Sequence, residues 1–264
     1  MPYFVGRELR LFYKDVGQGA TLVLIPGLGG DSRVFNPGLP FLRGRARLLM
    51  PDPRALGRSE GKPAQVSMEA MVRDLVELLG AVGLERASFL GASLGAVVAG
   101  ELAATYPHLV EKLILCTPPA SEGSSAGRVG QLLGQILWRS EPQEIMVSLL
   151  ELTVSPGYLE RNRRMIRELA RQHALDEGAI LVLRRQLEVL QAHRGDWGRI
   201  RVPTLILGGD QDRLVSLDDL EIVSNRIGGS EVSVLKGIGH HVFLEAPNLV
   251  AREVLKFLGS WSEK

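Results

Sequence analysis

Two segments of this chain place a serine between glycines with the spacing G-x-S-x-G, which is typical of a nucleophilic serine. One is centred on Ser93 and the other on Ser125. Only Ser93 follows directly on a strand-like run and opens a helix-like run, at residues 94–106. A sharp strand-to-helix turn would raise its hydroxyl above a sheet edge, and Gly91 and Gly95 would suit the crowded backbone there. We therefore predict that Ser93 is a nucleophile rather than a solvent-exposed turn residue, and that Ser125 lies in a loop.

A serine hydroxyl needs a general base, and the chain has five histidines that could serve. His240 comes shortly after a strand-like run at residues 232–235. The carboxyl ends of parallel strands share one edge of a sheet, so His240 would lie on the edge that carries Ser93. We predict that His240 is the base and that its neighbour His241 points elsewhere. The remaining three are expected in a surface turn or in surface or packing positions on helices: His108, His173 and His193.

The base in turn needs a carboxylate that fixes its tautomer and stabilises its charge. Asp210 and Asp212 both follow the strand-like run at residues 204–207, on the same expected edge. Asp212 is the better candidate and Asp210 is the reserve. The alternative is a polar turn rich in aspartate, which is common.

Acyl transfer also needs hydrogen-bond donors for an oxyanion. The segment PGLGG at residues 26–30 follows the apolar run TLVLI, and its glycines would let the backbone approach a substrate. We predict that the N–H groups of Leu28 and Leu94 form the oxyanion hole. The rival interpretation of this segment is a phosphate-binding loop, but the nucleotide-binding spacing and the P-loop lysine are both missing.

The elements that must position these residues alternate between strand-like and helix-like patterns. We expect strands at 3–5, 10–13, 21–25, 47–50, 87–90, 113–116, 204–207 and 232–235, and helices at 68–82, 94–106, 217–226 and 249–257. Between them only helical patterns occur, at 129–138, 142–152, 158–171 and 177–192. The order predicts an α/β fold with a mostly parallel central sheet, helices on both faces and an all-helical insertion. The predicted division is core at 1–119, helical cap at 120–197 and core at 198–264.

Composition narrows the class of protein further. The formal net charge of +1 gives no reason to expect nucleic acid or a membrane surface as a partner. A single cysteine, Cys116, allows no intramolecular disulfide and is expected to be a small core residue. We see no run suited to a signal peptide or a membrane span and no Cys/His cluster for zinc, so we expect a cytoplasmic protein without a metal or other cofactor.

Taken together, the motifs resemble those of the α/β-hydrolase superfamily over nearly the whole chain. The order Ser93, Asp212, His240 is that family's order. Its G-x-x-D acid segment matches residues 209–212, which favours Asp212 over Asp210. Its Gly-His followed by Glu and Pro matches residues 239–247. Its D-x-R-G-x-G-x-S loop matches residues 52–59, with Ala55 in place of the usual glycine, and its His-Gly before the oxyanion loop is Pro26-Gly27 here.

Within the superfamily the chain resembles the 3-oxoadipate enol-lactonase group and small carboxylesterases. The segments that carry this likeness are LGGDSRVFNPGLPFL, GLERASFLGASLG and RRQLEVLQAHRGDWGRIRVPTLILGG. The resemblance implies hydrolysis of a small-molecule ester or lactone through an acyl-enzyme. We expect the protein to be a monomer or a homodimer. The segment PGLGG is also similar to aminoacrylate hydrolases of pyrimidine breakdown, but these lack the elbow serine, so Ser93 argues against that role.

Other activities use the same scaffold. The triad can also carry out C–C bond hydrolysis or perhydrolysis, and a receptor on this fold would bind a small ligand without turnover. Epoxide hydrolases and dehalogenases need an aspartate where Ser93 stands. In the cap, Trp138, Met146 and Leu149, with Leu150, could line an apolar substrate pocket or simply pack the helices. Arg139 could bind a substrate carboxylate, although a solvated surface position is the simpler expectation.

Overall fold

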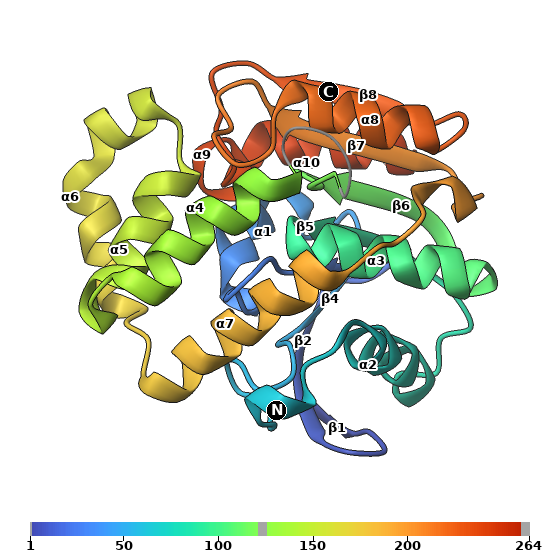
Figure 1. Cartoon of the computed structure of the whole chain (residues 1–264). Helices are drawn as coiled ribbons and strands as arrows, with labels where there is room; N and C mark the ends of the chain where they lie inside the picture. Colours follow the sequence, from blue (N-terminus) through green and yellow to red (C-terminus); the bar gives the residue numbers. More distant parts are fainter. Residues whose placement is uncertain (1, 121–125, 260–264) are drawn as a thin grey trace.

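A computed structural model of the chain describes residues 2–120 and 126–259. Within them, one sheet of eight strands runs through the centre in the order β1-β2-β4-β3-β5-β6-β7-β8 (Figure 1). Its members are β1 (Tyr3–Val5), β2 (Arg10–Val16), β3 (Thr21–Ile25), β4 (Arg47–Pro51), β5 (Ala87–Ala92), β6 (Val110–Cys116), β7 (Thr204–Gly209) and β8 (Glu231–Leu235). The strands from β4 to β8 pair in parallel, whereas β2 is antiparallel to both β1 and β4. The predicted mostly parallel sheet is confirmed.

Helices cover both faces of this sheet, as predicted. Side chains of α2 (Met68–Ala81), α3 (Leu94–Thr105) and α8 (Leu217–Arg226) share one apolar cluster with strand residues such as Val23 and Phe89. Side chains of α1 (Leu39–Leu42), α9 (Val242–Glu245) and α10 (Pro247–Leu258) share a second cluster with Leu22 and Leu90. Alternate residues of one strand serve opposite faces, so the central strands are apolar throughout. The described residues also form short 3-10 turns, which are η1 (Ser32–Gly38), η2 (Pro63–Gln65), η3 (Pro107–Leu109) and η4 (Trp197–Arg199).

Between β6 and β7 the described residues form four helices, and Figure 1 shows them grouped beside the sheet. They are α4 (Ala126–Arg139), α5 (Pro142–Thr153), α6 (Pro156–Gln172) and α7 (Glu177–Ala192). Ser155 and Asp176 cap the N-termini of α6 and α7 with their side chains. The division of the chain at residues 119 and 197 stays a prediction. No helix within residues 2–120 and 126–259 combines the length and apolar character that crossing a membrane requires.

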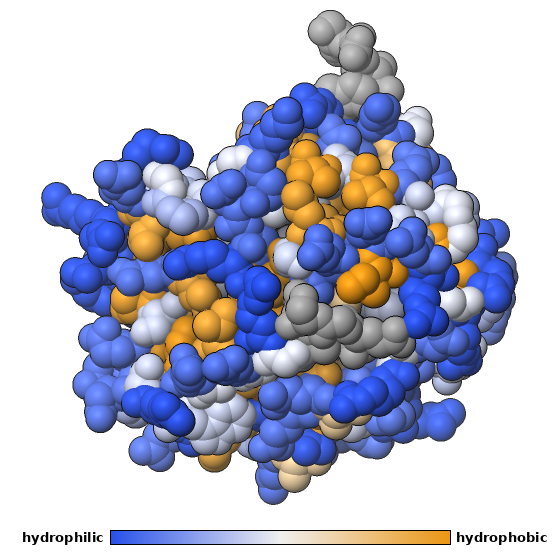
Figure 2. Space-filling model, turned by 45° about the horizontal axis from the view of Figure 1, so that its top comes forward, coloured by the Kyte–Doolittle hydropathy of each residue, from blue (hydrophilic) through white to orange (hydrophobic). Residues whose placement is uncertain are grey.

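The strand β8 forms one edge of the sheet and leaves part of its apolar surface uncovered. Val232 and Val234 are 47% and 43% exposed, and Leu217 at the start of α8 is 45% exposed. Figure 2 shows a mostly hydrophilic surface on which apolar side chains gather in a few separate groups. The other strands that carry the catalytic candidates lie inside the sheet, where backbone pairing on both sides holds their carboxyl ends in place.

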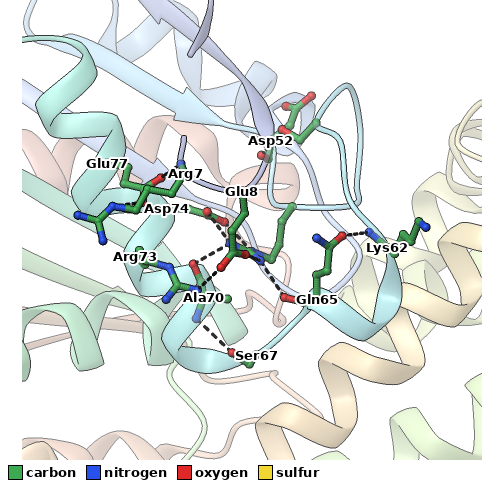
Figure 3. Close-up of polar contacts among 12 residues, drawn as sticks. Arg7, Glu8, Asp52, Lys62, Gln65, Ser67, Ala70, Arg73, Asp74 and Glu77 are labelled. Atoms are coloured by element: carbon green, nitrogen blue, oxygen red, sulfur yellow. Dashed lines mark hydrogen bonds and ion pairs between the residues drawn. The ribbon is translucent and has the colours of Figure 1, made fainter. Parts of the chain in front are cut away.

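A buried arginine anchors the loop that follows β4. The Arg54 side chain is 2% exposed and pairs with both oxygens of the Asp74 carboxylate, at 2.7 and 2.8 Å. It also donates to the carbonyl oxygens of Gln65 and Ala70, and it reaches Glu8 at 3.4 Å. Figure 3 shows Glu8, Gln65, Ala70 and Asp74 gathered in one region, with the side chain of Gln65 turned toward Lys62. Because each donor has an acceptor, this buried charge is compensated and holds the loop firmly.

Ala55, the next residue, has a left-handed backbone, with φ of 63°. A side chain in that conformation costs about 1–2 kcal/mol, whereas glycine adopts it freely. We expect Ala55→Gly to raise the free energy of unfolding by about 0.5–1 kcal/mol. This is less than the relieved strain, because glycine also gives the unfolded chain more conformational freedom. Urea unfolding followed by circular dichroism measures this change. Ala104→Gly, inside α3, is the matched control and should lower stability by about 1 kcal/mol; a loss in both variants would contradict the prediction.

Candidate active site

Ser93 stands at the sharp turn between β5 and α3. Its backbone has φ of 53° and ψ of −116°, a strained conformation for a residue with a side chain. A Cβ at Gly91 would collide with the carbonyl of Gly95, and a Cβ at Gly95 would collide with the carbonyl of Ile25. The Ser93 N–H donates to the carbonyl of Cys116 at 2.8 Å, which ties the turn to β6. These contacts explain why both flanking positions are glycine.

The loop after β3 lies directly against this turn. A Cβ at Gly27 would come within 3.3 Å of the Ser93 Cβ, and β3 pairs with β5 up to Ile25 and Gly91. Leu28 follows in the loop, and Leu94 is the first residue of α3. Within the described part of the chain, neither backbone N–H donates a hydrogen bond. Both groups are therefore free to donate to a developing oxyanion, with the positive end of the α3 dipole behind one of them.

An aspartate and a histidine form a buried pair on the same edge of the sheet. Nδ1 of His240 lies 2.7 Å from Oδ2 of Asp212, and their side chains are 9% and 1% exposed. The other oxygen of Asp212 accepts from the N–H groups of Leu214 and Val215, at 2.7 and 2.9 Å. The carboxylate is thus held on one side by backbone and presents its second oxygen to the imidazole. Asp210, the reserve candidate, is exposed and accepts from the N–H of Gly237 instead.

Strand pairing brings the loops of Ser93, Asp212 and His240 to one edge. Ala92 pairs with Cys116, Cys116 with Leu207, and Gly209 with Leu235, so β5 to β8 end side by side. The N–H of Gln211 donates to the carbonyl of Ile238 at 2.9 Å and joins the acid loop to the base loop. The predicted nucleophile, the predicted base with its carboxylate, and the two predicted oxyanion donors thereby follow strands that end on one edge of the sheet. Residues of these types in this arrangement are the ones that acyl transfer requires.

The other histidines lie away from this pair. Nδ1 of His173 contacts the carbonyl of Leu169 at 2.9 Å in α6, and His193 lies 3.6 Å from Glu101. His108 packs edge-on against Tyr106.

The lone cysteine, Cys116, is buried, which raises the pKa of its thiol to about 12. It therefore stays protonated and packs in the core, while its backbone supports the Ser93 turn.

His241 is directly adjacent to His240 but sits in a different environment. Burial, and secondarily the neighbouring His240, lower the pKa of its imidazole to about 4. Below pH 6.5 the unfolded chain takes up a proton that the folded chain does not, so stability falls as the pH falls toward 4. We expect the wild type to lose about 2 kcal/mol more unfolding free energy than His241→Gln between pH 7 and pH 5. Urea unfolding at both pH values tests this; equal losses would contradict it.

The predicted pocket residues of the helical insertion lie in packing or exposed positions. Trp138 is 46% exposed, with the Arg184 guanidinium 5.9 Å from its ring centre. Met146 packs in a cluster of α5 and α6, and Leu149 belongs to the main apolar core. Leu150 is buried in the same cluster as Met146, and Arg139 is exposed at the end of α4. Ser125, the serine of the second motif, lies outside the described residues. A role in binding substrate stays a prediction for the pocket residues of the insertion.

One buried side chain near the site was not predicted. Gln186 of α7 is 1% exposed, and its Oε1 accepts from the N–H of Gly29 at 2.8 Å. Leu183, one turn earlier, fills the space where a Gly29 side chain would stand. The helical insertion therefore holds the loop that carries Leu28. A lone glutamine on the apolar face of a helix is the signal that could have revealed it, because buried amides need partners.

Two cavities lie beside α3, the helix that follows Ser93. One of about 170 Å³ runs along α3, where its lining includes Val97, Glu101, His193 and Trp197, but not Ser93. A smaller cavity of about 40 Å³ is lined by Pro26, Gln186 and Leu94, of which Leu94 is one of the two predicted oxyanion donors. Within residues 2–120 and 126–259, no group of three or more His, Cys, Asp or Glu side chains is arranged to hold a metal ion.

Comparison with known proteins gives a consistent family assignment. The family model of the alpha/beta hydrolase fold matches residues 20–247. "Putative carbamate hydrolase RutD" of Agrobacterium fabrum is 28% identical over 91% of this chain and 94% of its own length. The solved structure of a hydrolase from Pseudomonas aeruginosa PA01 is 25% identical, with a TM-score of 0.85 over 98% of both chains. The enol-lactonase from Burkholderia xenovorans LB400 shares the fold, at 23% identity and a TM-score of 0.85 over 98% of this chain and 100% of that one.

Proposed function

The chain belongs to the α/β-hydrolase fold family, and on that premise we propose that it hydrolyses small carboxylic esters or lactones through a covalent acyl-enzyme. The observation that carries the proposal is the hydrogen bond of 2.7 Å between His240 and Asp212, on the sheet edge that also carries Ser93. A carboxylate that fixes an imidazole in this way leaves Nε2 available to accept a proton from a serine. The strained backbone of Ser93 gives further support.

In the proposed reaction, Oγ of Ser93 attacks the acyl carbon while Nε2 of His240 accepts its proton. Asp212 stabilises the imidazolium through Nδ1, and the N–H groups of Leu28 and Leu94 donate to the oxyanion. Collapse of the tetrahedral intermediate breaks the acyl C–O bond, and His240 returns the proton to the leaving alcohol. A water molecule, deprotonated by His240, then attacks the acyl carbon and releases the carboxylic acid and Ser93.

A carbamate is the second candidate substrate class. The relative named RutD, whose printed name contains carbamate hydrolase, matches nearly the full length of this chain. A carbamate carbonyl passes through the same kind of tetrahedral intermediate, so the same groups would serve. The lower electrophilicity of that carbonyl makes esters and lactones the first choice.

A substrate panel tests the proposal. The purified protein is assayed with p-nitrophenyl acetate and butyrate, a γ-lactone, an N-alkyl p-nitrophenyl carbamate and a β-diketone as the C–C substrate, and calorimetry measures whether it binds each compound. We expect saturable turnover of the esters or the lactone, and inhibition by a serine-directed phosphonate. Turnover of the carbamate alone would favour the second candidate. Saturable binding without any turnover would favour a receptor, and turnover restricted to a C–C substrate would favour that class of hydrolase.

A further inference from the structure

The loop that carries His240 is fastened to the helical insertion at the junction of α5 and α6. The N–H of His241 donates to the carbonyl of Thr153, the last residue of α5, at 2.8 Å. A Cβ at Gly239 would collide with the backbone nitrogen of Ser155. The two backbones therefore touch on both sides of His240, and glycine is required at position 239 for this close approach.

One carboxylate joins these two segments. Oε1 of Glu245 accepts from the N–H of Gly239 and from the N–H of Ser155, each at 3.0 Å. Its Oε2 accepts from the hydroxyl of Ser155 at 2.5 Å. Ser155 is 3% exposed, so these bonds are largely shielded from water. Hydrogen bonds to a carboxylate are among the stronger ones in proteins.

The acid loop reaches the same junction. Arg213, next to Asp212, donates to the carbonyl oxygens of Glu151 and Val154 at the end of α5. These carbonyls have no partner within the helix that ends there, so a guanidinium is a suitable donor. Residues 151–155 of the insertion thus contact the loops of both members of the Asp212–His240 pair.

We propose that Glu245 is a positioning residue: together with Ser155 it latches the His240 loop to the insertion and so sets the position of His240 relative to Ser93. The proposal rests on the proposed function. Glu245 lies on α9, after His240 in the chain, and Gly239 immediately precedes His240. The hydrogen bond between them therefore closes the short loop that carries His240. A displacement of about 1 Å at a reacting group can cost about 100-fold in rate, which is the scale on which losing this latch would act.

Four variants test the latch. Glu245→Met removes every acceptor at similar length and should lower kcat by about 30- to 100-fold, with KM changed less than about threefold. Glu245→Gln keeps an oxygen for the two N–H groups and an amide for the Ser155 hydroxyl, so it should stay within about threefold of wild type with an unchanged pH–rate profile. Ser155→Ala removes the hydroxyl that donates to Glu245 and should lower kcat by about 3- to 10-fold. Glu221→Met, at an exposed position of α8, is the matched control.

Two rates are recorded for each variant: turnover of the best substrate, and the rate constant for phosphonylation of Ser93, which also needs a placed base. Circular dichroism and the unfolding midpoint show whether a variant folds. If Glu245→Met does not fold, the role of Glu245 is tested by the kcat of Ser155→Ala and by the kcat and pH–rate profile of Glu245→Gln. Rates near wild type in Ser155→Ala and Glu245→Met would overturn the latch, as would a Glu245→Gln variant as slow as Glu245→Met. A wild type that neither turns over substrate nor reacts with phosphonate would overturn the proposed function instead.

Discussion

Ser93→Ala is expected to lower the turnover of an ester or lactone by at least about 10⁴-fold, because it removes the attacking oxygen and with it the acyl-enzyme. The remaining oxyanion donors and substrate contacts account for any residual rate. Stability should change little. Alanine makes the same demand on the left-handed backbone at this position as serine does, so the strain is neither relieved nor increased.

The measurement is steady-state hydrolysis of p-nitrophenyl butyrate, with mass spectrometry of the phosphonate-treated protein. The second motif supplies the control: Ser125→Ala should keep full turnover and full labelling. A Ser93→Ala variant that still turns over and still takes the label would refute Ser93 as the nucleophile. A loss confined to Ser125→Ala would transfer the role to that serine.

Asp212→Asn is expected to lower kcat by about 10⁴-fold while the fold is kept. The reason lies in the two N–H groups of Leu214 and Val215, which both donate to Oδ1 of Asp212. An asparagine would keep its oxygen on that side to accept them, which turns its NH₂ group toward Nδ1 of His240. The imidazole would then carry its proton on Nε2 and could not accept the proton of Ser93.

The matched control is Asp210→Asn, two residues earlier. Asp210 is exposed and contacts the N–H of Gly237, so we expect a change in kcat of less than about threefold. Steady-state kinetics of both variants between pH 6 and pH 9 test the pair of predictions. A normal rate for Asp212→Asn, or equal losses in the two variants, would show that the carboxylate of Asp212 does not orient the base.

Most of the core elements could be predicted because each carries its own local pattern. The run TLVLI predicts a buried strand, and the structure has β3 at those five residues. The predicted helix at 68–82 is α2, whose N-terminus is capped by the Ser67 hydroxyl accepting from the N–H of Ala70. Short elements such as α1 and α9, of four residues each, show no helical period and were not predicted. The strand β6 begins three residues before the predicted start at 113, since β5 offers a pairing partner there.

The contacts of the insertion were beyond what the sequence alone could indicate. Gln186 and Gly29 lie 157 positions apart, and Glu245 and Ser155 lie 90 positions apart. No local period or motif connects such pairs, because each member satisfies its hydrogen bonds only after α5, α6 and α7 have packed on the sheet edge. The exposed position of Trp138 follows in the same way from how α4 packs.

The sequence by itself determined which residues could do chemistry: a serine in a glycine-flanked strand-to-helix turn, a histidine and two aspartates after strands of one parallel sheet, and a glycine-rich loop after another. Spacing and strand direction suffice for this, since parallel strands end on a common edge. Only the tertiary structure decided which aspartate oxygen meets His240, because that depends on how the turn after β7 uses the N–H groups of Leu214 and Val215. Packing likewise decided that the helical insertion holds both the oxyanion loop and the histidine loop.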